Sequence, residues 1–86
     1  MYTLKYAIDV DKACKKFPTR DKKAIVDSLE KLKKNPRSDG SIKLSGNREA
    51  YRVRVGDYRI IYRISDKELL VLIIDIENRA SVYKKR

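Results

Sequence analysis

Apolar and polar residues alternate along most of the second half of the chain, in the segments 50–55, 58–65 and 69–76. This period of two predicts β-strands, because successive side chains of a strand point to opposite faces of a sheet. Gly56-Asp57 separates the first two segments and suits a two-residue hairpin turn. Such a turn places Arg54 directly opposite Arg59, and Arg52 opposite Ile61. Like charges that face each other across a ladder destabilise it, so the arrangement favours an anion-binding role.

The second turn, Asp66-Lys67-Glu68, sets the register of the third strand. A two-residue loop would direct Asp75 into the core, at a cost of several kcal/mol for an unpaired carboxylate. We therefore expect a three-residue loop, with Asp75 opposite Arg59 on the outer face. The core positions of this strand are then Leu70, Leu72, Ile74 and Ile76.

The first half of the chain predicts one strand and two helices. Residues 2–8 alternate weakly, as in a strand, and Asp9 or Asp11 can cap a short helix that Pro18 ends. Thr19 is the expected N-cap of a second helix that stops at Asn35-Pro36. Its predicted buried stripe is Ile25, Val26, Leu29 and Leu32, and residues 37–49 form a polar connector. The prediction is an α+β fold in a single domain, 1–86: an N-terminal strand, a helical hairpin and a twisted antiparallel sheet.

Charge narrows the classes of partner. The chain has 22 Lys and Arg against 12 Asp and Glu, a formal net charge of +10. Such an excess attracts polyanions, although solubility alone remains an open explanation. The absence of histidine and the presence of one cysteine, Cys14, argue against a zinc site and exclude Ser–His and Cys–His nucleophile pairs. The chain shows no apolar run of membrane-spanning length and no secretory pattern, which indicates a cytoplasmic protein.

Several arginines gather on the sheet face opposite the helices. On the predicted register this outer face holds Arg52, Arg54, Arg59, Ile61, Arg63, Val71, Ile73 and Asp75. The C-terminal segment adds Arg79, Tyr83, Lys84, Lys85 and Arg86. One arginine on an outer strand face is normally just solvated, but four on adjacent strands favour phosphate recognition. With a tyrosine on which a base can stack, the face predicts a site for single-stranded RNA.

Four stretches resemble the RelE/ParE superfamily of bacterial and archaeal toxins: "KLSG" at 43–46, "YRVRVGDYRIIYRI" at 51–64, "LLVLIIDIENR" at 69–79 and "VY" at 82–83. The resemblance covers nearly the whole chain and implies the RelE-like microbial RNase-type fold. Its RelE branch implies a ribosome-dependent endoribonuclease that cuts messenger RNA without a metal or cofactor, through attack of the substrate's own 2′-OH. It also implies a cognate antitoxin as partner, in a complex that can bind operator DNA.

The resemblance also assigns roles to residues. Carried over, the catalytic positions are Arg54, Arg59, Arg79 and Tyr83, and the RNA-binding positions are Lys43, Arg52, Arg63, Lys84, Lys85 and Arg86. Arginine stands at 52 and 54 where the best-known pattern has lysine, and Asn78 stands where many relatives have histidine. Arginine cannot shuttle protons, so the general-base candidates are Tyr83 and Glu49.

Two other functions stay open. The ParE branch shares the fold and implies inhibition of DNA gyrase without RNA cleavage. The other hypothesis is a catalytically inactive relative that only binds antitoxin or RNA. For any of the three, an acidic or amphipathic helical antitoxin segment is expected to cover the arginines and to bury Ile61, Val71 and Ile73.

Overall fold

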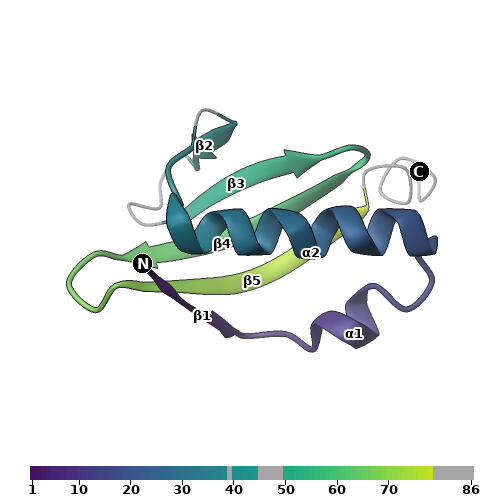
Figure 1. Cartoon of the computed structure of the whole chain (residues 1–86), viewed down its shortest axis with the longest axis horizontal. Helices are drawn as coiled ribbons and strands as arrows, with labels where there is room; N and C mark the ends of the chain where they lie inside the picture. The colour runs from purple at the N-terminus through teal and green to yellow at the C-terminus, as the bar shows by residue number, and fades with distance from the viewer. Residues whose placement is uncertain (39, 45–49, 79–86) are drawn as a thin grey trace.

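The computed structural model of the 86-residue chain describes residues 1–38, 40–44 and 50–78. The elements in chain order are β1 (Thr3–Tyr6), α1 (Val10–Ala13), α2 (Thr19–Lys34), β2 (Ser41–Lys43), β3 (Ala50–Val55), β4 (Tyr58–Ser65) and β5 (Leu70–Asn78). Figure 1 shows α2 lying across one face of the curved sheet, with α1 beside it. The predicted α+β architecture is confirmed.

The sheet has the strand order β1-β5-β4-β3-β2. Its β2–β3, β3–β4 and β4–β5 pairs are antiparallel, but β1 runs parallel to β5. The sheet is therefore mixed rather than wholly antiparallel, because the helices carry the chain away from β1 and no hairpin fixes its direction. The predicted polar connector also contains β2, a three-residue edge strand that places Ile42 opposite Arg52.

The helices begin and end slightly differently from the sequence prediction. Asp9 caps α1 by accepting the backbone N–H of Lys12 at 3.1 Å, but α1 ends at Ala13, well before Pro18. The N-cap of α2 is Pro18 rather than Thr19, which is already helical. The Pro18 carbonyl accepts the N–H groups of Asp21 and Lys22, both at 3.0 Å.

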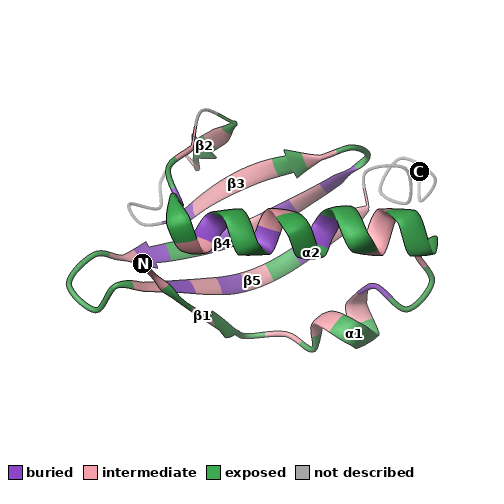
Figure 2. Cartoon of the chain, in the orientation of Figure 1, coloured by how far each residue is buried: buried purple, intermediate pink, exposed green. Residues whose placement is uncertain are grey.

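The core lies between α2 and the sheet (Figure 2). Ile25, Leu29 and Leu32 of α2 are buried, as predicted, but Val26 is 52% exposed and does not belong to the stripe. The sheet contributes Tyr58, Ile60, Tyr62, Ile64, Val71, Ile73 and Ile76. Cys14 is also buried, as expected for a small apolar side chain.

The β3–β4 hairpin has the predicted register. Val55 pairs with Tyr58, Arg54 with Arg59 and Arg52 with Ile61. The connection is the two-residue turn, with Gly56 at φ 60°, a left-handed conformation that glycine adopts without strain. The like-charged pair predicted from the sequence is therefore present.

The predicted β4–β5 register is wrong in every pair. Ser65 pairs with Leu70, so the loop has four residues, and a β-bulge opposite Ile61 and Tyr62 inserts Ile74 as an extra residue. Val71 and Ile73 are fully buried and lie in the core, not on the outer face. Asp75 does face outward as predicted, but it pairs with Ile61, and Glu77 takes the place opposite Arg59.

Candidate functional site

The outer face of the sheet carries the predicted arginines. Alternate residues of β4 pack against α2, so Arg59, Ile61 and Arg63 between them project from the other side. The cross-strand register adds residues of β3 and β5 to the same side. We call this surface the arginine face and define it by Arg52, Arg54, Arg59, Ile61, Arg63, Leu72, Asp75 and Glu77.

Three charged side chains meet at the turn end of the arginine face. Arg59 lies between Arg54 on β3 and Glu77 on β5 in the register of the sheet. The Glu77 Oε1 is 3.5 Å from the Arg59 Nη2, and the two side chains are 37% and 30% exposed. The Arg59 Nε is buried and has no hydrogen-bond partner among the described residues. A donor in this condition stabilises an anion placed against it more than a solvated donor would.

The other two arginines have different neighbours. Arg54 is exposed, and its Nε donates to the carbonyl of Gly56 at 3.1 Å, which leaves its terminal nitrogens at the surface. Arg52 is half-buried between Ile61 and Ile42 in the register, and Ile42 is 54% exposed. The turn end is therefore strongly cationic, with apolar side chains beside it.

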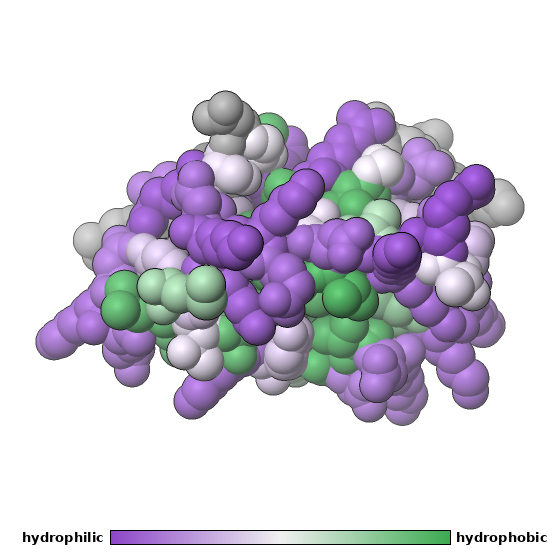
Figure 3. All heavy atoms as spheres, viewed as in Figure 1, coloured by the Kyte–Doolittle hydropathy of each residue, from purple (hydrophilic) through white to green (hydrophobic). Residues whose placement is uncertain are grey.

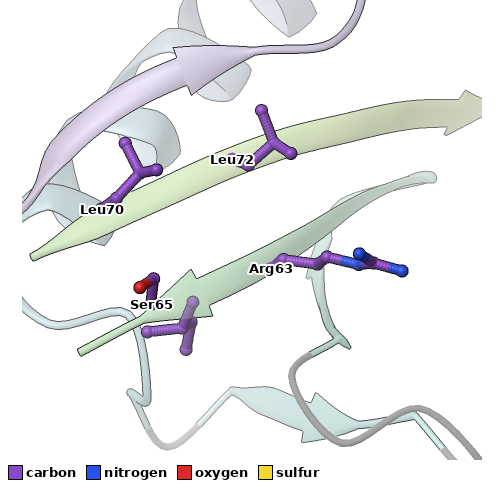
Figure 4. A pocket seen from close by; sticks show the side chains of 5 residues that line it. Arg63, Ser65, Leu70 and Leu72 are labelled. Carbon is purple, nitrogen blue, oxygen red and sulfur yellow. The ribbon is translucent and has the colours of Figure 1, made fainter. Parts of the chain in front are cut away.

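At the opposite end of the arginine face there is a shallow depression of about 140 Å³, lined by Arg63, Ile64, Ser65, Leu70 and Leu72. Arg63 pairs with Leu72, and Ser65 with Leu70, across β4 and β5. In Figure 4 the two leucines rise from β5, while the Arg63 side chain extends away from them. The depression thus has an apolar wall and a guanidinium at its rim.

The remaining predicted site residues divide into two groups. Lys43 pairs with Tyr51, which stacks on the buried Tyr62, so the register places Lys43 on the helix side of the sheet and not with the arginines. The others lie outside the described residues: Glu49, Arg79, Tyr83, Lys84, Lys85 and Arg86.

A second arginine–carboxylate pair lies at the loop end of the sheet. Arg37 donates two hydrogen bonds to Asp66, at 2.9 and 2.8 Å, and its Nε donates to the Tyr51 hydroxyl at 3.2 Å. The Tyr2 hydroxyl donates to the same carboxylate at 2.7 Å. The bonds from Arg37, then from Tyr2, hold the pKa of Asp66 below its usual value, and Asp66 raises the pKa of Tyr2. This cluster joins the N-terminus, the α2–β2 loop, β3 and the β4–β5 loop.

Two core tyrosines donate hydrogen bonds from their hydroxyls to the helical layer and the loop that follows it. Both phenols have a raised pKa and are neutral near pH 7. Tyr58 donates to Asp21 at 2.7 Å, and burial together with that bond raises the pKa of Tyr58 to about 12. Tyr62 donates to the Pro36 carbonyl at 2.6 Å, and burial raises the pKa of this tyrosine as well. Both side chains are buried in the core.

The helix-bearing side is mostly hydrophilic, with hydrophobic atoms visible between charged side chains (Figure 3). A hollow between α1 and α2 is lined by Val10, Asp11, Cys14, Lys15, Lys22, Ile25 and Val26. Burial raises the pKa of the Cys14 thiol there, so it has little thiolate character. Within residues 1–38, 40–44 and 50–78, no helix has the length and apolar character to cross a membrane.

Sequence reasoning missed Glu77 and the leucines of the depression. The four-residue β4–β5 loop exchanges the two faces of β5 before the bulge at Ile74, and the loop and the bulge together bring Glu77 rather than Asp75 opposite Arg59. The available signal was the size of the β4–β5 loop, since a four-residue connection places Leu70 and Leu72 outward.

Comparison with known proteins agrees with this fold. Residues 2–83 match the family described as ParE toxin of type II toxin-antitoxin system, parDE. The chain is 27% identical to Toxin RelG of Mycobacterium tuberculosis over 85 residues, which cover 98% of each chain. It is 30% identical to a chain of the archaeal RelE-RelB complex from Pyrococcus horikoshii, with a TM-score of 0.78 over 91% of this chain and 94% of that one.

Isolated RelE toxin of E. coli, at 22% identity, has the same fold, with a TM-score of 0.76 over 99% of this chain and 94% of that one. The family match and the fold together define a small toxin of a type II toxin–antitoxin system. More particularly, the chain belongs to the RelE/ParE family of these toxins, as the sequence resemblance indicated.

Proposed function

We propose that this toxin is a ribosome-dependent endoribonuclease that cuts messenger RNA and so inhibits translation. The observation that carries the proposal is the Arg54–Arg59 pair, with a buried Arg59 Nε that has no partner among the described residues. Two guanidinium groups side by side suit the phosphate of a single RNA strand, since each offers parallel donors and a permanent charge.

The chemistry needs no metal in this scheme. The substrate's 2′-oxygen attacks the adjacent phosphorus, the bond from phosphorus to the 5′-oxygen breaks, and the products carry a 2′,3′-cyclic phosphate and a 5′-hydroxyl. Negative charge increases on the nonbridging phosphate oxygens in the transition state, where Arg54 and Arg59 stabilise it. Arg79 is proposed to act on the same phosphate, and Arg52, Lys84, Lys85 and Arg86 to hold the RNA backbone.

One group must accept the 2′-OH proton and another must give a proton to the departing 5′-oxygen. Glu77 is the carboxylate that lies beside Arg59, and we propose it as the acceptor. The pairing holds the carboxylate beside the position proposed for the phosphate. Tyr83 is proposed to supply the proton to the leaving group. Tyr83 and Glu49 remain the alternative acceptors.

A cognate antitoxin is the proposed protein partner, because one solved relative is described as a RelE-RelB complex. We expect an acidic or amphipathic segment to cover the arginine face. Val71 and Ile73 are buried and cannot contribute, so its apolar contacts fall on Ile61 and Ile42. Operator DNA is the proposed ligand of the complex, and the cytoplasm, where the ribosomes are, its place of action.

The match to the ParE family model favours a second candidate, inhibition of DNA gyrase. A gyrase inhibitor has no need of Arg54, Arg59 and Glu77 in one cluster, and for this reason we place it second. A toxin fold that binds antitoxin or RNA without cutting is the third candidate, since arginine replaces the expected lysine at 52 and 54.

The test is incubation of the purified chain with ribosomes that hold a defined messenger RNA, in the presence of a metal chelator at a concentration the ribosome tolerates. Cleavage within the decoding site that leaves a 2′,3′-cyclic phosphate supports the proposal. Intact messenger RNA together with loss of gyrase supercoiling supports the second candidate. If both substrates are untouched, the chain is the binding-only relative. Tyr83→Phe in the same assay shows whether the phenol transfers a proton.

A further inference from the structure

The depression beside Leu70 and Leu72 lies on the same face of the sheet as the proposed phosphate site. Arg63 follows Arg59 by four residues on β4, which separates them by roughly 13 Å along the strand. An extended single strand of RNA crosses this distance within a few nucleotides. A strand bound at Arg54 and Arg59 can therefore also reach the depression.

The lining of the depression differs from the phosphate site. Leu70 and Leu72 form an apolar wall, whereas Arg63 stands at the rim and makes no hydrogen bond or ion pair with the described residues. The Ser65 hydroxyl donates to Glu68 at 3.1 Å. One free guanidinium plane and an aliphatic surface suit a flat ring with polar edges better than they suit a phosphate.

We propose that this depression is a nucleobase subsite, in which a base of the bound RNA lies on Leu70 and Leu72 and the exposed Arg63 side chain turns toward it, so that the guanidinium stacks on the ring. The inference rests on the proposed function, since it assumes that an RNA strand follows the arginine face. It adds recognition of the base to a surface that otherwise contacts only the sugar–phosphate backbone.

Charge argues for RNA as the occupant rather than an apolar side chain of a protein. The path from Arg59 to the depression passes Ile61, with Arg52 and Arg54 on its β3 side and Asp75 and Glu77 on its β5 side. The β3 side of the path attracts a polyanion, while its bases need apolar surface at intervals. Phosphates and bases of one strand thus match both kinds of surface.

The experiment compares two fluorescein-labelled RNA hexamers at low salt: one of mixed sequence, and one of equal length in which every nucleotide is abasic. The ratio of their dissociation constants isolates the contribution of the bases, because the phosphates are the same. Stacking of one base changes affinity by about fivefold or more. Leu72→Ser removes apolar surface, and Arg63→Lys keeps the charge but removes the plane.

We expect the wild-type chain to bind the base-bearing hexamer at least about fivefold more tightly than the abasic hexamer. Both variants lower this ratio and leave the affinity for the abasic hexamer unchanged. Val26→Ser, a matched aliphatic-to-serine change at an exposed position of α2, leaves the ratio as it is. Thermal melting checks that each variant is folded, and Arg63→Lys decides alone if Leu72→Ser unfolds.

The inference is overturned if the wild-type ratio is close to one, or if neither folded variant lowers it. Should the variants weaken only the complex with the cognate antitoxin, the depression holds a protein side chain and not a base. Failure of the underlying function looks different: neither hexamer binds, or Arg59→Ala changes the affinity of neither. If Arg59→Ala weakens the binding of both hexamers equally, while Leu72→Ser and Arg63→Lys leave the ratio unchanged, the proposed phosphate site is supported. Only the nucleobase subsite is then contradicted.

Discussion

Two arginine–carboxylate pairs at opposite ends of the sheet differ in how completely their donors are used. Arg37 makes two bonds to Asp66 below 3 Å, and its third nitrogen binds the Tyr51 hydroxyl. Arg59 has a single contact with Glu77 at 3.5 Å, and its Nε lacks a partner among the described residues. The first pair is complete, whereas the second leaves donors for a third group.

This difference in hydrogen bonding indicates a structural role for the Arg37–Asp66 pair and a functional role for the Arg59–Glu77 pair. Bidentate geometry and a tyrosine on each partner make the Arg37–Asp66 cluster a connection between the N-terminus, the α2–β2 loop and the β4–β5 loop. The Arg59–Glu77 pair lies next to a second arginine, Arg54, and its geometry is poor for stability alone. We infer that the Arg59 cluster is completed by a phosphate of the substrate.

The largest predicted effect is that of Glu77→Gln on cleavage. A general base contributes roughly 10²- to 10⁴-fold to a rate, and we expect a loss in this range. Single-turnover cleavage on programmed ribosomes measures this loss.

Glu30→Gln is the matched control for Glu77→Gln. Glu30 forms a similar contact with Lys33 at 3.3 Å, but on the exposed side of α2. Its removal leaves the rate unchanged. If folded Glu77→Gln cleaves at the wild-type rate, Glu77 is only a counter-ion of Arg59, and the base is Tyr83 or Glu49.

Arg37→Ala is predicted to produce the opposite pattern, a lower Tm with unchanged cleavage. The substitution removes three hydrogen bonds and leaves the Tyr51 ring without the guanidinium that lies 5.5 Å from its centre. Differential scanning calorimetry and the ribosome assay measure the two quantities on one preparation. A normal Tm with impaired cleavage would show that this cluster belongs to the functional site.

The same cluster predicts a pH dependence of stability. Because Arg37 lowers the pKa of Asp66 in the folded state, the stabilisation is fully present above the usual aspartate pKa near 3.8 and is lost as the pH falls through the lower folded value. Urea unfolding from about pH 6 to about pH 2 follows this loss. Asp66→Asn removes that component, whereas Asp27→Asn on the exposed side of α2 retains it.

The smallest predicted effect concerns Leu69, the last residue of the β4–β5 loop that begins at Asp66. Leu69 has φ 51°, a left-handed conformation that costs a leucine roughly 1–2 kcal/mol. Glycine relieves this cost and adds some chain entropy to the unfolded state, so Leu69→Gly raises the free energy of unfolding by about 0.5 kcal/mol. A decrease in the free energy of unfolding would mean that the apolar contacts of the half-exposed Leu69 side chain stabilise the fold by more than the backbone conformation costs.

The sequence correctly predicted which arginines share the outer face of the sheet, but it placed the residues of β5 beside them incorrectly. A two-residue turn fixes every pair of a hairpin, and for this reason the opposition of Arg54 and Arg59 could be read from Gly56-Asp57. The run LLVLII in β5 is apolar at both parities, so its pattern cannot reveal which residues face the core or where a bulge falls. Glu77 was missed because the predicted strand ended at residue 76 and its register was two residues off at Arg59.

Contacts between distant segments could not be predicted from the sequence, for a different reason. Arg37 and Asp66 are 29 residues apart, and no local periodicity relates them. The parallel pairing of β1 with β5 likewise depends on how the intervening helices return the chain to the sheet. Local rules predicted the elements and one hairpin, while tertiary packing determined the remaining register.

The most direct test of the central claim is the rate of messenger RNA cleavage by Arg59→Ala on programmed ribosomes, measured beside Arg20→Ala. Arg20 is an exposed arginine in the first turn of α2 and provides the matched change. We predict that folded Arg59→Ala cleaves at least about 100-fold more slowly than the wild-type chain, since it loses a donor to the transition state, and that Arg20→Ala cleaves normally. Wild-type cleavage by Arg59→Ala would contradict the account, because the arginine face would then play no part in the chemistry.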